Sequence, residues 1–237
     1  MTVKLPPTPP EPPFSVRTPF LIGRKDVTRL TLVRHAQQDY PEGDEFDHSL
    51  WDNPPLSGLG RVQAHAVAAV LGEADVDVIA CSTMQRAMET AEIIASPHGL
   101  KPVVRSELRE IDSYREIPDG ANPQDLVPPA EWADHEERWQ RWVSWDLMFF
   151  GESSAEFRAR CLGAIDELVD EHRGEHIVLI SHGGVINALL GSILGIEEDM
   201  FFLPHHCSIS TVVIHDDIRR VHSINEHQHL HIGILTN

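Results

Sequence analysis

The sequence is poor in cysteine, in basic residues and in long hydrophobic runs. Its 237 residues include only 3 cysteines, an odd number without the spacing of a metal site. This excludes a disulfide scaffold and is typical of free thiols in a reducing compartment. The apolar stretches are far too short to cross a membrane, and the first residues lack the charged-then-apolar pattern of a secretory signal. We therefore expect a cytoplasmic protein that has no membrane attachment.

Positive charge is also scarce. Lysine and arginine together number 19 against 37 aspartates and glutamates, so the formal net charge is -18. A field this negative repels nucleic acids and anionic membranes, so neither is an expected partner. An anionic substrate would have to be held by a local cluster of arginines. The length and the hydrophobic fraction of 41% exclude a largely disordered chain and suit one α/β domain of generous size.

Two segments stand apart from the rest by composition. Residues 1–24 are rich in proline, and we predict an extended arm that lies on the domain or is disordered in solution. Residues 113–150 hold four of the five tryptophans, and we call this segment the insertion. Its aromatic face could pack on the main sheet, or the insertion could form a lid that fixes substrate choice, or both. Residues 25–237, the insertion included, are predicted to form a single domain.

Strand and helix patterns alternate along that domain. Short apolar runs predict strands over residues 29–33, 76–80, 102–105, 176–180, 209–214 and 220–224. Helical periodicity between cap residues and glycines predicts helices over residues 57–72, 84–96, 153–172 and 185–194. Such alternation implies a mostly parallel sheet with helices on both faces, which is a three-layer α/β/α sandwich.

Three of the predicted strands lead into residues that suit an anionic ligand. Arg34 and His35 follow the first strand, and Arg86 lies in the first turn of the helix after the second. His182 follows a later strand and precedes two glycines that open a helix. Ligands of open α/β sheets sit at the carboxyl ends of strands, and a helix N-terminus offers free N–H groups to an anion. An arginine is electrostatically disfavoured in a first helical turn unless an anion lies beside it.

Taken in order, these segments resemble the histidine phosphatase superfamily, whose fold is phosphoglycerate mutase-like. The resemblance covers about residues 29–215. It rests on five motifs, which read RHA at 34–36, LSGLGRVQA at 56–64, STMQRAMETA at 82–91, GES at 151–153 and SHGG at 181–184. The usual glycine after the first histidine is Ala36 here. The mutase segments with arginine pairs for a phosphosugar acid are not recognisable, which disfavours a true mutase.

The resemblance implies a metal-independent phosphatase, without cofactor, that hydrolyses a small-molecule phosphomonoester through a phosphohistidine. The residues that it implies are the nucleophile His35, the acid Glu110, the phosphate ligands Arg34, Arg86 and His182, and the substrate contacts Gln37, Ser57 and Gly183. A bound phosphate would favour the protonated form of His182. Asp112 and Glu116 compete with Glu110 for the role of the acid.

Several alternatives stay open at this point. The fold also suits a mutase that moves a phosphoryl group between hydroxyls, or a phospholigand-binding protein that has lost turnover. A homodimer is open as well. The pair His205-His206 and the alternating histidines at 227, 229 and 231 resemble a metal site, but we interpret them as a polar strand or tail.

Overall fold

The computed structural model describes residues 18–40, 52–113, 115–118 and 121–237. Most of the proline-rich arm therefore lies outside the described residues. Its last part begins with a 3-10 turn, Thr18–Phe20. The side chain of Arg220 donates to the carbonyl oxygen of Pro19, and His222 bonds to that of Phe20, both at 2.8 Å. The described end of the arm thus lies against the domain.

The described residues form one six-stranded sheet in the order β3-β2-β4-β1-β5-β6. The strands are β1 (Thr28–Arg34), β2 (Val78–Ser82), β3 (Val103–Arg105), β4 (His176–Ser181), β5 (Ile209–His215) and β6 (Ile218–Glu226). The four strands from β3 to β1 run parallel, whereas β5 is antiparallel to both of its neighbours. The mostly parallel sheet predicted from the sequence is confirmed.

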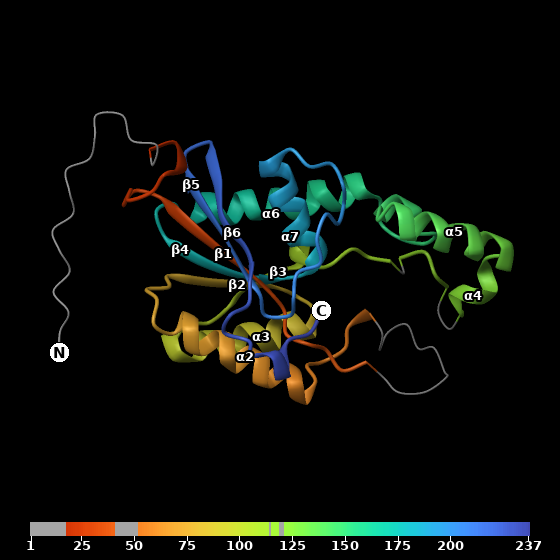
Figure 1. Ribbon diagram of the computed structural model, residues 1–237, viewed down its shortest axis with the longest axis horizontal. Helices are drawn as coiled ribbons and strands as arrows, with labels where there is room; N and C mark the ends of the chain where they lie inside the picture. The colour runs from red at the N-terminus through yellow and green to blue at the C-terminus, as the bar shows by residue number, and fades with distance from the viewer. Residues whose placement is uncertain (1–17, 41–51, 114, 119–120) are drawn as a thin grey trace.

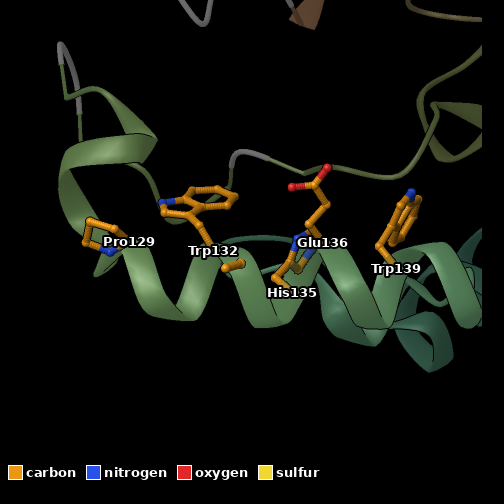
Figure 2. A pocket seen from close by; sticks show the side chains of 6 residues that line it. Pro129, Trp132, His135, Glu136 and Trp139 are labelled. Atoms are coloured by element: carbon orange, nitrogen blue, oxygen red, sulfur yellow. The ribbon is translucent and has the colours of Figure 1, made fainter.

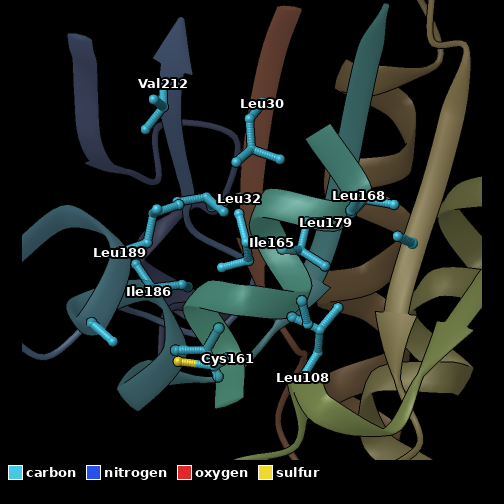
Figure 3. Close-up of a cluster of buried hydrophobic side chains, with 14 of the residues drawn as sticks. Leu30, Leu32, Leu108, Cys161, Ile165, Leu168, Leu179, Ile186, Leu189 and Val212 are labelled. Atoms are coloured by element: carbon cyan, nitrogen blue, oxygen red, sulfur yellow. The ribbon is translucent and has the colours of Figure 1, made fainter. Parts of the chain in front are cut away.

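Helices cover both faces of this sheet (Figure 1). One face carries α2 (Gly58–Leu71) and α3 (Gln85–Ala95), and the other carries α6 (Ser154–Glu171) and α7 (Gly183–Leu194). Along β4, Ile177 and Leu179 join the core beneath α6 and α7 (Figure 3), whereas Val178 and Ile180 join the core of α2 and α3. Alternate side chains of a strand point to opposite faces, so the four consecutive apolar residues of β4, Ile177 to Ile180, supply two cores at once.

Strands β1 and β4 end side by side. Arg34 pairs with Ser181 in parallel register, and the N–H of His35 donates to the carbonyl oxygen of Ser181 at 2.9 Å. Because the two strands run in the same direction, the residues that follow them, His35 and His182, meet at one edge of the sheet. Strand β2 lies on the other side of β4 and leads into α3 at the same edge.

The insertion lies between the 3-10 turn Ser106–Leu108 and α6. It holds α4 (Pro123–Leu126), α5 (Pro129–Arg141) and the 3-10 turn Trp145–Leu147. Helix α5 projects from the body of the domain, and no residue of it is buried (Figure 1). The two ends of the insertion are held together, because the N–H of Glu152 donates to the carbonyl oxygen of Asp112 at 2.8 Å.

The tryptophans of the insertion have unequal surroundings. Trp145 is buried in the core beneath α6 and α7, and Trp139 packs against that core. Trp142 is 67% exposed. Trp132 and Trp139 also line a cavity of about 640 Å³, and Figure 2 shows both rings on the same side of α5 with the carboxylate of Glu136 between them. The aromatic residues are thus divided between core packing and an open face.

Candidate active site

His35 lies directly after β1 and is 3% exposed. Its Nδ1 donates to the carbonyl oxygen of Ala36 at 2.8 Å, which leaves Nε2 as the unprotonated nitrogen. The Nε–H of Arg86 donates to that Nε2 at 3.2 Å. Burial, and after it the positive charge of Arg86, lowers the pKa of His35 well below its ordinary value. The imidazole is therefore neutral and keeps a lone pair on Nε2.

Two arginines of the site come from β1 and α3. Arg86 is 8% exposed, and its Nη1 donates to the carbonyl oxygen of Asp52 at 3.0 Å. Arg34 donates through Nη1 to the carbonyl oxygen of Pro204. Burial lowers the pKa of both guanidiniums, and the negative charge of Glu110 opposes that shift. Guanidinium stays charged in proteins, so two cations stand here in a chain of strong negative charge.

His182 is fully buried at the start of α7. Its ring centroid lies 5.0 Å from that of His35, and its Nε2 lies 2.7 Å from the hydroxyl oxygen of Ser82. Burial, and then the charges of Arg86 and Arg34, lowers the pKa of His182 well below its ordinary value. The ring is therefore neutral at rest. The protonated His182 expected from the sequence would need the added negative charge of a bound phosphate.

Two buried nitrogens of the site, Arg34 Nε and His182 Nδ1, have no hydrogen-bond partner among the residues that the structure describes. Buried polar groups are nearly always hydrogen-bonded, so an unpartnered pair of this kind marks a place for a polar ligand. Gly183 is the first residue of α7, where the helix dipole favours an anion. Together these groups suit the oxygens of a phosphoryl group.

Glu110 lies just before the insertion in the chain and reaches the N-terminus of α7. Its Oε2 accepts a hydrogen bond from the N–H of Gly184 at 3.0 Å, and its Oε1 accepts one from the N–H of Ile111 at 3.1 Å. A Cβ atom on residue 184 would lie 2.3 Å from Oε1, so this approach requires glycine. Of the three carboxylates considered from the sequence, Glu110 is the one brought to α7 in this way. Glu116 is exposed on the insertion, and the backbone of Asp112 closes the base of the insertion.

Gln37 and Ser57 bond to each other beside the loop that follows His35. The Ser57 hydroxyl caps α2 by accepting from the N–H of Gly60 at 2.9 Å, and it donates to Gln37 Oε1 at 2.9 Å. The N–H of Gln37 donates to Gln63 Oε1 at 2.9 Å. The Ser57 hydroxyl is thus used within the protein, as a helix cap and as a brace for Gln37.

Sequence reasoning missed His206, which was interpreted as merely polar. It is 3% exposed, and its ring centroid lies 5.5 Å from that of His35. Burial, followed by the charge of Arg34, lowers the pKa of His206 to about 3. Its ring nitrogens bond to Thr236 Oγ1 at 2.9 Å and Gln38 Oε1 at 3.2 Å. Only the topology could have indicated this position of His206. Because β5 runs antiparallel to β1, the residues just before β5 lie at the edge of the sheet where β1 ends.

The histidines at 227, 229 and 231 follow β6 and do not lie on a strand. His227 Nδ1 and His229 Nε2 bond to the carbonyl oxygens of Asn225 and Cys207 at 2.8 and 2.9 Å. In the part of the chain that the structure describes, no three or more His, Cys, Asp or Glu side chains are grouped to hold a metal ion. Within the same part, no helix is both long and apolar enough to span a membrane.

We compared the chain with protein families, with curated proteins and with solved structures. The profile of the histidine phosphatase superfamily (branch 1) matches residues 30–227. The chain is 30% identical over 190 residues to glucosyl-3-phosphoglycerate phosphatase of Mycolicibacterium vanbaalenii, covering 73% of this chain and 77% of that protein. It is 28% identical over 192 residues to a probable phosphoglycerate mutase of Yersinia enterocolitica, covering 78% and 85%.

The solved structures agree with these sequence relatives. The native structure of mycobacterial glucosyl-3-phosphoglycerate phosphatase superposes with a TM-score of 0.66 and 28% identity, covering 85% of this chain and all of that one. The family profile spans most of the domain, and within it the rings of His35 and His182 lie 5.0 Å apart. The chain belongs to the histidine phosphatase superfamily, branch 1.

Proposed function

We propose that this protein is a metal-independent phosphatase that hydrolyses a small-molecule phosphomonoester through a phosphohistidine on His35. The observation that carries the proposal is the state of His35: a buried, neutral ring whose Nε2 lone pair faces the guanidinium of Arg86. A nitrogen nucleophile needs this protonation state. The positive charge of Arg34 and Arg86 does the work for which other phosphatases use a metal ion.

In the first step, the Nε2 lone pair of His35 attacks phosphorus and forms a P–N bond. The P–O bond to the substrate alcohol breaks, and its oxygen takes a proton from Glu110. Arg34, Arg86 and His182 neutralise the charge on the three remaining phosphoryl oxygens, which is where phosphoryl transfer needs stabilisation. The products of this step are the free alcohol, phosphohistidine and the Glu110 carboxylate.

In the second step, water attacks phosphorus and gives one proton to Glu110. The P–N bond breaks, inorganic phosphate leaves, and His35 regains its neutral Nε2. Glu110 thereby regains the proton that it gave to the alcohol in the first step, so the sum is ester plus water to alcohol plus phosphate. The hydrogen bonds that Glu110 accepts from Gly184 and Ile111 support this double role, because they fix the carboxylate at the start of α7.

A small substrate in the cytoplasm fits the other observations. The relative from Mycolicibacterium vanbaalenii is named for a small phosphorylated molecule, glucosyl-3-phosphoglycerate. The three cysteines are unpaired and buried, as expected for a reducing compartment. We leave the homodimer as a prediction that the mass of the protein in solution would decide.

Hydrolysis of an aryl phosphate and of an alkyl phosphate by the purified protein tests the proposal. We expect turnover of both, an unchanged rate after chelation of divalent metals, and no turnover by His35→Ala while that variant keeps its circular dichroism. Turnover that survives in His35→Ala would contradict a phosphohistidine. A loss on chelation that zinc or magnesium restores would contradict metal independence.

A further inference from the structure

The segment that carries Glu110 is held from behind by one arginine of α6. Nη1 of Arg160 donates to the carbonyl oxygens of Glu107 and Arg109 at 2.6 and 3.0 Å, and Nη2 lies 3.5 Å from that of Glu110. Three backbone carbonyls around the acid thus converge on a single guanidinium. This segment follows a 3-10 turn and has left the sheet, which holds it only through the bond from Ser181 Oγ of β4 to the carbonyl oxygen of Leu108 at 3.2 Å among the bonds described.

The same guanidinium is itself fixed by a buried carboxylate. Nε and Nη2 of Arg160 donate to the two carboxylate oxygens of Glu152 at 2.8 and 2.6 Å, a bidentate pair in which the Glu152 side chain is only 4% exposed. The hydrogen bonds and charge of Glu152 outweigh the effect of burial and hold the pKa of Arg160 above its ordinary value. Because the guanidinium is planar, fixing its Nε and Nη2 on Glu152 also fixes the directions of its other N–H donors.

Glu152 also marks the point where the insertion rejoins the domain. Its N–H donates to the carbonyl oxygen of Asp112, and its carboxylate lies 3.6 Å from the guanidinium of Arg115. Both ends of the insertion therefore meet at the carboxylate that orients Arg160. A displacement of the insertion at this base would move Glu152, then Arg160, and then the backbone of Glu110.

We propose that Arg160, oriented by Glu152, is a positioning residue that places the Glu110 carboxyl for proton transfer and ties it to the base of the insertion. This inference rests on the proposed function, since it assumes that Glu110 is the acid. Arg160 acts on the backbone of the acid and does not touch the phosphoryl group. Its loss should therefore weaken proton donation to the leaving alcohol and leave attack by His35 intact.

Leaving-group dependence gives a readout that a merely structural role would not move. An aryl phosphate needs little proton donation, and an alkyl phosphate needs much. Lysine cannot replace this guanidinium, because one ammonium group cannot bond to both the Glu152 carboxylate and the backbone carbonyls. We expect Arg160→Lys to lose about tenfold to hundredfold in kcat on the alkyl ester and less than about threefold on the aryl ester, as for a weakened general acid.

Arg158 on the same helix is a matched control. It donates to the buried carboxylate of Asp199 at 3.1 and 3.0 Å and to the carbonyl oxygens of Glu197 and Glu198 at 2.9 and 3.0 Å. Its side chain is 22% exposed and that of Asp199 5%, against 24% and 4% for Arg160 and Glu152. Arg158 thus makes the same kinds of bond as Arg160, but to residues 197–199 and not to the backbone around Glu110. Arg158→Lys should show no preference between the two esters.

Two further variants complete the test. Glu152→Gln keeps the shape and removes the charge that fixes Arg160, so it should show the same alkyl-selective loss even if Arg160→Lys folds poorly. In a Glu110→Gln background, Arg160→Lys should add no further selectivity, because the two changes remove one effect. Equal losses of Arg160→Lys on both esters, or equal selectivity in Arg158→Lys, would overturn the inference. Failure of the proposed function would look different, since Glu110→Gln itself would then show no selectivity or the wild type no turnover.

Discussion

We call the buried side chains of His35, Arg86, His182 and His206 the floor of the site. The floor and helix α5 of the insertion differ in how firmly they are packed. His35, His182 and Arg86 stand where strands end or a helix starts, and none is more than 8% exposed. Helix α5 has no buried residue, and of its two tryptophans only Trp139 packs against the core. A constellation that must hold phosphorus in line needs rigid support. Segments that contact variable substrates do not need such rigid support, and they are in general less firmly packed.

Glu110 stands at the boundary between these regions. Its carboxylate is bonded to the rigid start of α7, and its backbone is bonded through Arg160 to the base of the insertion. The comparison therefore predicts three kinds of effect. Changes to the floor should abolish turnover, changes at the boundary should affect proton donation, and changes on α5 should affect substrate affinity.

The largest effect should come from the floor. Arg86→Leu removes a donor that reaches His35 Nε2, where the phosphoryl group must bind. We expect kcat on an aryl phosphate to fall about 10²–10³-fold, as when a preorganised donor to a developing charge is lost. Arg61→Leu on α2, whose partner is Glu89, should stay close to the wild-type rate. If Arg86→Leu kept more than about a tenth of the rate, the electrostatic role of the floor would be wrong.

A single added methyl group at residue 184 should displace the Glu110 carboxylate, which lies between the floor and the insertion. Gly184→Ala places a Cβ atom 2.3 Å from Glu110 Oε1 and 3.1 Å from Phe157 Cζ, so the carboxylate must move. We expect kcat on an alkyl phosphate to fall by about tenfold or more, and less on an aryl phosphate. Gly163→Ala in α6 meets nothing within 4 Å and should stabilise the protein by up to about 1 kcal/mol. An unchanged alkyl rate in Gly184→Ala would argue against the placement of Glu110.

The buried rings of the floor should make stability depend on pH. His206 has a pKa of about 3 when folded, against about 6.5 when unfolded, so between these values it takes up a proton only on unfolding. The free energy of unfolding should therefore fall as the pH drops below about 6.5, by about 1.4 kcal/mol per pH unit for this one ring. Between pH 7 and pH 5, where the unfolded ring is only partly protonated at the upper end, His206→Gln should flatten the slope of the urea-unfolding free energy by about 1 kcal/mol per pH unit. Parallel slopes for the two proteins would show that His206 is not held neutral.

The smallest effect should come from α5. Trp132→Ala removes a ring that lines the cavity on this helix. We expect KM for the best substrate in a panel of small phosphomonoesters to rise severalfold, roughly threefold to tenfold, with kcat on a small aryl phosphate unchanged. Trp142→Ala, which removes a ring that is 67% exposed, should change neither quantity. An equal rise in KM for both substrates would mean that Trp132 supports the fold of the insertion and does not select among substrates.

Much of the floor could be predicted because it is encoded locally. The strand expected at residues 176–180 is β4 (His176–Ser181), and the helix expected at 57–72 is α2 (Gly58–Leu71). Parallel strands align their carboxyl ends, so two histidines that each follow a strand had to approach each other. The helix α5, whose periodicity is clear but whose packing is not, could be placed along the chain but not in space.

What the sequence could not provide depends on long-range contacts. His206 reaches His35 only because β5 returns antiparallel beside β1. The need for glycine at residue 184 follows from a carboxylate 74 residues earlier in the chain. The role of Ser57 as a helix cap could be expected from the sequence, but its bond to Gln37 Oε1 could not, and its contact with substrate stays a prediction. Local pattern identifies which residue types can do the chemistry, and tertiary packing decides which atoms are free to do it.

The central claim is that the phosphoryl group passes through Nε2 of His35, and trapping it there is the most direct test. The protein is mixed with a radiolabelled phosphomonoester and quenched in alkali within one turnover, and the labelled peptide is then mapped. We predict label on His35 that survives alkali and is lost in acid, with none in His35→Ala. Label on another residue, or His35→Ala that turns over substrate without label, would contradict the account.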